Sequence, residues 1–260
     1  MRFARVLRPD GPAYGIVRDD VGEESMVQLI DGVPFGDWAE TDQVAPLSSV
    51  RLLAPVIPTK ILCVGKNYAD HAGEMGGEVP SEPLVFLKPP TAVVGPEDAI
   101  VLPALSEEVH HEAELAVVIG GLARKVPVDQ AGLHIAGYAC ANDVTARDLQ
   151  RRDAQWARAK GFDTFCPLGP WLDTDVDPTQ GVRVQARVNG APRQDGSTAD
   201  LAFGVAELVS FCSQFTTLLP GDVLLTGTPA GVGPLADGDR VEVEVEGLGV
   251  LANPVQAEAG

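Results

Sequence analysis

The 260-residue sequence predicts an α+β protein built around a large mixed or antiparallel β-sheet. Short apolar runs separated by Gly, Pro, Asn and Asp turn signals recur along the whole chain, which is typical of strands. Segments with helical spacing are few and short. Hydrophobic residues make up 45% of the chain, enough for a sizeable core, and this composition argues against disorder.

Residues 1–56 are predicted to form a small β-rich N-terminal domain. The apolar runs FARVL, AYGIV and VQLI alternate with turn signals in this part of the chain. The segment from Leu52 to Lys60 is punctuated by prolines, and we place a domain boundary near Val56. The second predicted domain therefore comprises residues 57–260.

The second domain begins with three predicted buried strands, at Lys60–Gly65, Glu114–Gly121 and Ile135–Asp143. Val182–Gly190 alternates like a half-buried strand, and its Asn-Gly pair favours a hairpin turn. The C-terminal runs DVLLTG, DRVEVEVEG and VLANPV are further strands. Two segments favour helix: Thr145–Lys160, with Thr145 as a possible N-cap, and Val205–Gln214.

Composition and charge exclude several classes of function. The net charge of −18 disfavours binding to nucleic acid phosphates or to membrane surfaces. The longest apolar runs are too short to span a bilayer, and the N-terminus lacks the apolar region of a signal peptide. The four dispersed cysteines form no CxxC pair, so we expect buried reduced thiols. A soluble cytoplasmic protein is the resulting expectation.

A pair of carboxylates on one predicted strand forms the first candidate site. Glu112 and Glu114 point to the same face of a strand, while Ala113 points to the other. Such a pair beside an apolar run is costly to desolvate, and a bound cation would relieve the cost. Asp143, at the end of another predicted strand, is a third candidate, and three carboxylates favour Mg²⁺ or Mn²⁺ over Zn²⁺. A solvated acidic face is the alternative for the glutamate pair.

A second candidate site lies in the glycine-flanked segment 65–77. His71 and Glu74 are three residues apart, so they share one face of a helical turn. A carboxylate beside an imidazole orients the ring and raises its basicity, which suits a general base. The flanking glycines would allow this helix to move as a lid. A surface contact without function is the alternative.

Two further segments carry residues suited to anion binding. The basic cluster that follows Asp143 could bind a carboxylate, although a solvated helix face is the alternative for Arg151 and Arg152. The Gly-rich turn around Thr228 lacks the GxxxxGK[ST] pattern of nucleotide-binding loops. Its backbone N–H groups and the Thr228 hydroxyl could hold an anion, and a plain connecting loop is the alternative.

Six stretches of the sequence, taken in the order in which they occur, resemble the fumarylacetoacetate hydrolase superfamily. The resemblance is greatest to its acylpyruvase, oxaloacetate decarboxylase and 2-hydroxyhepta-2,4-diene-1,7-dioate isomerase group. Each stretch alone is weakly specific, but the ordered set, which covers residues 60 to about 254, is highly specific. The stretches are Cys63–Met75, Glu82–Pro96, His110–Gly120, Gly137–Gln150, Ala159–Trp171 and Leu219–Gly233.

The resemblance implies a mixed β-sandwich roll that is usually dimeric, so a homodimer is expected. It implies that Glu112, Glu114 and Asp143 are metal ligands for Mg²⁺ or Mn²⁺, and that His71 and Glu74 form a lid dyad that activates water. It also implies that Lys160 is the active-site lysine. The substrate contacts that it implies are Lys88, Arg147, Gln150 and Thr228. The N-terminal domain is poorly matched.

The expected substrate is a small 2-oxo acid that reacts through an enolate. A metal that chelates the carboxylate and the 2-oxo oxygen would support C–C hydrolysis of an acylpyruvate, decarboxylation of oxaloacetate or isomerisation of a hydroxydienoate. The dyad favours hydrolysis, with decarboxylation next. The alternative of another class is a non-catalytic, metal-dependent dicarboxylate-binding protein, which would have no need of His71, Glu74 and Lys160.

Overall fold

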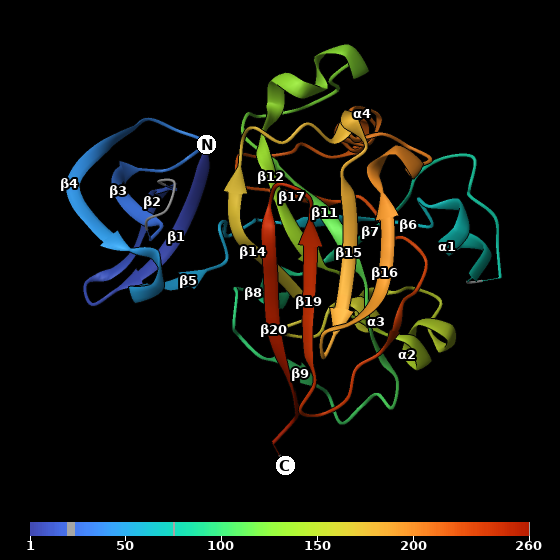
Figure 1. Ribbon diagram of the computed structural model, residues 1–260. Helices are drawn as coiled ribbons and strands as arrows, with labels where there is room; N and C mark the ends of the chain where they lie inside the picture. Colours follow the sequence, from blue (N-terminus) through green and yellow to red (C-terminus); the bar gives the residue numbers. More distant parts are fainter. Residues whose placement is uncertain (20–23, 75, 260) are drawn as a thin grey trace.

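The computed structural model describes residues 1–19, 24–74 and 76–259 (Figure 1). The strands of the first half are β1 (Arg2–Arg8), β2 (Gly11–Arg18), β3 (Met26–Gly32), β4 (Trp38–Pro46), β5 (Arg51–Leu53), β6 (Ile61–Gly65), β7 (Leu84–Lys88), β8 (Val93–Val94), β9 (Ile100–Leu102), β10 (Val109–His111) and β11 (Ala113–Ile119). The strands of the second half are β12 (Ile135–Asn142), β13 (Thr145–Ala146), β14 (Cys166–Asp173), β15 (Arg183–Val188), β16 (Ala191–Ser197), β17 (Val223–Leu225), β18 (Gly233–Pro234), β19 (Arg240–Val245) and β20 (Gly249–Ala257). The α-helices are α1 (Ala69–Glu74), α2 (Arg147–Arg152), α3 (Ala157–Lys160) and α4 (Val205–Phe215), and 3-10 turns lie at Leu47–Ser49, Pro90–Ala92, Val128–His134, Pro178–Gln180 and Thr198–Asp200.

A large mixed sheet runs through the molecule, as the sequence predicted. Its strands lie in the order β4-β3-β2-β1-β14-β12-β11-β17-β6-β7, with β5 against β1 and β8 against β14. Strands β11, β12 and β14 are antiparallel neighbours, whereas β17 and β6 are parallel. Strands distant in sequence are thereby adjacent in the sheet.

A second sheet, in the order β16-β15-β19-β20-β9, covers one face of the large sheet (Figure 1). Ala113 and Leu115 of β11 pack between the two sheets against Val184 of β15 and Val243 of β19, all of them buried. This apolar layer leaves the opposite face of β11 for other side chains, because side chains alternate along a strand. The arrangement confirms the predicted β-sandwich roll.

The N-terminal strands lie to one side of the main body (Figure 1) and continue its large sheet. Phe3 of β1 is paired with Leu172 of β14, and Phe3 also belongs to the same buried cluster as Ile61. Val56 is fully buried in that cluster. The domain boundary near Val56 stays a prediction, and the two predicted domains share one apolar core.

The segment 145–160 differs from its predicted form. Thr145 and Ala146 pair with β10 as strand β13, so the helical residues divide between α2 and α3. The Thr145 hydroxyl donates to the carbonyl of Asp143, 2.8 Å away, and α2 has no side-chain cap. The predicted Thr145 cap is therefore wrong, because a non-local strand pairing holds its backbone extended.

Two other expectations are confirmed in the structure. The helix predicted at Val205–Gln214 corresponds to α4, and all four cysteines are buried and form no disulfide. Within the ranges the structure describes, every helix is too short or too polar to cross a membrane.

Candidate active site

Three buried carboxylates meet where β10, β11 and β12 approach one another. Glu112 lies between β10 and β11, Glu114 lies in β11, and Asp143 directly follows β12. The antiparallel pairing of β11 with β12 joins them, and the Asp143 N–H donates to the Glu112 carbonyl at 2.9 Å. Each side chain offers an oxygen atom, and these oxygens all lie within 4.8 Å of one another.

The three carboxylates are almost fully buried. Glu112 is 3% exposed, and Glu114 and Asp143 are each 1% exposed, so they do not form a solvated acidic face. The sandwich core holds Ala113 and Leu115, and strand alternation therefore turns both glutamates to the other side of β11. Removing three carboxylates from water is costly unless cations compensate them.

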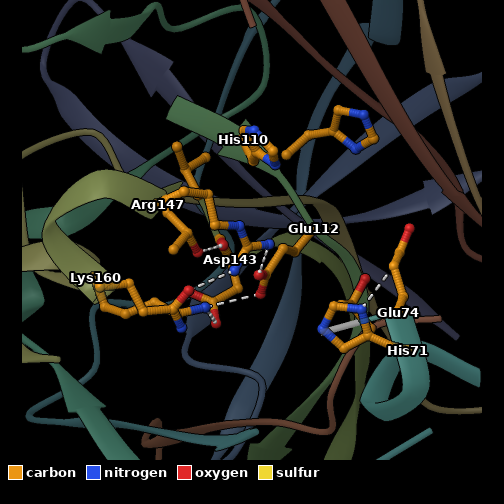
Figure 2. Close-up of polar contacts among 12 residues, drawn as sticks. His71, Glu74, His110, Glu112, Asp143, Arg147 and Lys160 are labelled. Atoms are coloured by element: carbon orange, nitrogen blue, oxygen red, sulfur yellow. Dashed lines mark hydrogen bonds and ion pairs between the residues drawn. The ribbon is translucent and has the colours of Figure 1, made fainter. Parts of the chain in front are cut away.

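Three buried cations pair with Glu112 and Asp143, and Figure 2 labels two of them, Arg147 and Lys160. Lys160 Nζ donates to Glu112 Oε2 at 2.8 Å and to Asp143 Oδ2 at 2.6 Å. Arg147 pairs with Glu112, and Lys88 pairs with Asp143. Each of the three cations is at most 2% exposed. Glu112 and Asp143 thus each contact two cationic side chains.

Glu114 differs from the other two carboxylates in its surroundings. Its carboxylate accepts a hydrogen bond from the backbone N–H of Gly227, which lies 2.6 Å from Oε2. It forms no ion pair with the residues that the structure describes. Burial, followed by the charges of Asp143 and Glu112, raises the pKa of Glu114 well above its usual range. A buried carboxylate of this kind fits a hard divalent cation, which prefers oxygen ligands.

For Glu112 and Lys160, unlike Glu114, the pKa shifts favour the charged form. Burial opposes ionisation of Glu112, but the adjacent Arg147 and Lys160 outweigh it and hold the pKa of Glu112 below its usual range. Burial also disfavours charge on Lys160, and Asp143 and Glu112 nonetheless raise the pKa of Lys160. The pKa shifts of Glu112 and Lys160 thus both favour the charged form.

The His71–Glu74 pair lies beside the carboxylates, on α1 (Figure 2). His71 Nδ1 is 3.1 Å from Glu74 Oε2, and the His71 side chain is buried. Glu74 also accepts the N–H of Gly231, 3.2 Å away, and this contact links α1 to the Gly-rich turn. The helical turn predicted from the i, i+3 spacing is present, and the imidazole lines the same cavity as the three carboxylates.

A cavity of about 200 Å³ joins these groups. Phe86 and Trp156 form an apolar wall, with ring centroids 5.3 Å apart in an edge-to-face arrangement, and Lys160 Nζ lies 4.9 Å from the Phe86 ring. Drug-sized ligands occupy pockets of roughly 300–1,000 Å³. The cavity therefore suits a molecule smaller than a typical drug. Its lining also includes Gln150 and Thr228, whereas Lys88 contacts the site through Asp143.

Gln194 is a buried residue that supports the site and that the sequence analysis did not select. It is 1% exposed, and its Oε1 accepts the backbone N–H of Ala113 and faces His111 Nδ1, at 2.9 and 3.0 Å. Its Nε2 donates to Thr228 Oγ1 at 2.7 Å. Gln194 thus links β16 to β11 and to the Gly-rich turn, but its surrounding sequence, APRQDGS, has no distinguishing pattern.

The exposure of Arg151 and Arg152 distinguishes a solvated helix face from a carboxylate-binding patch. Arg151 pairs with Glu108 and Arg152 approaches Asp153, and the two arginine side chains are 62% and 64% exposed. Both arginines thus belong to a solvated surface, as the alternative interpretation predicted.

A family model described as "Fumarylacetoacetate (FAA) hydrolase C-terminal" matches residues 60–256. The chain belongs to the fumarylacetoacetate hydrolase family. A second model, "Rv2993c-like, N-terminal", matches residues 1–55. The recognised family consists of enzymes, including hydrolases, isomerases and tautomerases, that act on small molecules. Membership favours an enzyme over the binding protein considered as an alternative.

Two curated relatives illustrate this similarity. Protein Rv2993c of Mycobacterium tuberculosis is 49% identical over 259 residues, which cover 98% of each chain. The mitochondrial oxaloacetate tautomerase FAHD2A of Bos taurus is 48% identical over 225 residues, which cover 82% of this chain and 71% of the relative.

Two solved structures share the fold. A 5-carboxymethyl-2-hydroxymuconate delta-isomerase from Mycobacterium smegmatis matches with a TM-score of 0.93 and 49% identity, covering 99% of this chain and 100% of the other. A fumarylpyruvate hydrolase from Pseudomonas aeruginosa, solved with Mn²⁺ and pyruvate, matches with a TM-score of 0.74 and 36% identity, covering 84% and 93% of the two chains.

Proposed function

We propose that this enzyme transfers a proton next to the 2-oxo group of a small 2-oxo acid and so interconverts keto and enol forms of an oxaloacetate-like substrate. The observation that carries this proposal is the meeting of three carboxylates, Lys160 and the His71 imidazole in one small cavity. Enolisation needs a place for the developing oxyanion and a base for the proton, and these groups provide both.

The proposed metal ligands are Glu112, Glu114 and Asp143, whose buried oxygens fit Mg²⁺ or Mn²⁺. A bound ion would supply a Lewis acid for the carboxylate and the 2-oxo oxygen of the substrate. Lys160 and Arg147 add positive charge beside that position, and Lys88 keeps Asp143 oriented. The proposed roles of Gln150 and Thr228 are contacts to the substrate carboxylate.

His71 is the proposed proton carrier. We assign the Nδ1 proton to the contact with Glu74, because an ionised carboxylate can only accept a hydrogen bond. Nε2 is then left as the basic atom of the ring. A base must lie within hydrogen-bond reach of the proton it removes, and α1 places the ring on the lining of the cavity.

The comparisons favour proton transfer over the alternatives. The oxaloacetate tautomerase and the delta-isomerase are 48% and 49% identical to this chain, whereas the fumarylpyruvate hydrolase is 36% identical. A tautomerase and an isomerase both move protons along an enolisable chain without breaking a C–C bond. Isomerisation of 2-hydroxyhepta-2,4-diene-1,7-dioate fits the same machinery.

C–C hydrolysis of an acylpyruvate is the second candidate. The observation that favours it is the His71–Glu74 pair, because the same base can activate a water molecule. Decarboxylation of oxaloacetate would use the same enolate without that water.

A panel of substrates with Mg²⁺ separates these reactions. Enol-oxaloacetate, acetylpyruvate, fumarylpyruvate and a hydroxyheptadienedioate are each followed by ultraviolet absorbance, with pyruvate release measured in parallel. We expect rapid loss of enol-oxaloacetate without matching pyruvate release. Rapid pyruvate release from acetylpyruvate, with enol-oxaloacetate decaying at its uncatalysed rate, would replace the proposal by the second candidate.

A further inference from the structure

Lys66 is a further cation of the cavity, and its surroundings differ from those of the buried cations. Lys88, Arg147 and Lys160 are each paired with a site carboxylate. Lys66 lines the same cavity and is half-buried. Its side chain makes no ion pair or hydrogen bond with residues 1–19, 24–74 or 76–259. Its charge is therefore available to a ligand.

The backbone at Lys66 holds a conformation that disfavours a lysine. Lys66 directly follows β6 and has a φ of 58°, in the left-handed region that glycine and asparagine adopt more easily. Residues held in such regions concentrate at binding sites and active sites. The ammonium lies beside Gly77, where an added Cβ would be 2.6 Å from Nζ. The loop after α1 thus leaves room for this side chain.

The lining of the cavity includes buried, half-buried and exposed residues. Glu112 and its neighbours are buried, Lys66 and Gln150 are half-buried, and Arg151 is exposed. A substrate whose 2-oxo acid end lies at the carboxylates would direct its other end towards the more exposed residues. Arg151 already pairs with Glu108. Among the described residues, Lys66 is therefore the partly exposed cation of the cavity lining that has no ion-pair partner.

We propose that Lys66 binds a second, distal carboxylate of the substrate and makes the enzyme selective for 2-oxo dicarboxylic acids over 2-oxo monocarboxylic acids. This inference rests on the proposed function, because it places the 2-oxo acid end at the metal ligands. The net charge of −18 repels a dianion at long range, but salt screens that field beyond about 8 Å. At contact distance the ammonium decides the selectivity.

Binding of non-reacting analogues tests this selectivity directly. Lactate and malate share the 2-hydroxy acid group and differ by the distal carboxylate, while oxalate probes the metal end alone. Calorimetry with Mg²⁺ gives their Kd values for the wild type and Lys66→Met. In the wild type we expect malate to bind at least tenfold more tightly than lactate. Lys66→Met should lower the ratio of the lactate Kd to the malate Kd about tenfold by weakening malate binding. The oxalate and lactate Kd values should stay unchanged.

Three control variants define the cause of any change. Lys66→Arg keeps the charge and should restore most of the malate preference. Arg151→Met removes the paired, exposed cation and should have little effect. Lys125→Met changes another lysine with positive φ, 54°, which is exposed and lies outside the cavity lining, so its Kd values should equal those of the wild type.

Each contrary result has a distinct meaning. An unchanged malate-to-lactate ratio in Lys66→Met, or a loss of the ratio in Arg151→Met instead, would overturn the role of Lys66 while oxalate binding supports the proposed function. An equal loss of oxalate, lactate and malate in Lys66→Met would show that the lysine maintains the shape of the site, which also overturns the inference. If the wild type binds none of the three acids, both the proposed function and this inference are wrong.

Discussion

Replacing Glu114 by glutamine separates metal binding from folding. Glu114→Gln removes an ionisable carboxyl group that has no ion-pair partner among the described residues and that lies beside two other buried carboxylates. The amide oxygen can still accept the Gly227 N–H. We therefore expect the metal-free variant to have a Tm equal to or above that of the wild type, although a proposed metal ligand is lost.

The metal-dependent stabilisation should nearly disappear in the same variant. At a metal concentration of 100 times Kd, binding stabilises the wild type by about 2.7 kcal/mol, which corresponds to a Tm increase of roughly 5–10 °C. If losing a ligand weakens binding about 100-fold, the same metal concentration contributes only about 0.4 kcal/mol, or roughly 1 °C. Differential scanning calorimetry with and without Mg²⁺ measures both values.

Glu112→Gln is the matched control, because it changes an equally buried carboxylate that pairs with Arg147 and Lys160. Breaking a buried ion pair leaves cations uncompensated, so its metal-free form should lose about 3 kcal/mol of stability, roughly 6–12 °C in Tm. Both variants should lose the metal response. The reasoning is refuted if Glu114→Gln keeps the wild-type metal response, or if it destabilises the metal-free protein as much as Glu112→Gln does.

Three further predictions concern the base, the supporting hydrogen bonds and the assembly. His71→Ala should lower kcat for enol-oxaloacetate by about 10²-fold with an unchanged Mg²⁺ affinity, and a wild-type rate would contradict its role as base. Gln194→Leu removes the acceptor of the buried Ala113 N–H and the donor to the Pro229 carbonyl, so we expect a loss of about 2–4 kcal/mol in denaturant unfolding, and a change below 1 kcal/mol would contradict this. We also predict a homodimer, with a mass by light scattering of twice the 27.3 kDa chain, and a monomer mass at micromolar concentration would refute it.

Local sequence pattern determined much of this protein. Strand alternation predicted that Glu112 and Glu114 point the same way, and their oxygens do meet although Glu112 lies just before β11; the i, i+3 spacing places His71 beside Glu74. The sandwich fold and the family followed from ordered motifs, which are confirmed by the structure and the comparisons. These features are predictable because covalent geometry fixes how residues a few positions apart are oriented.

Only the tertiary structure decided how distant residues meet. The register of β11 with β12 places Asp143 beside Glu112, and β13 pairing replaced the predicted start of the helix at Thr145. The structure also shows that Glu114 lacks the cation pairs of its two neighbours, and that Lys66 lines the cavity without such a pair among the described residues. Pairing and burial depend on contacts between residues far apart in sequence, and local periodicity does not encode which of those contacts form.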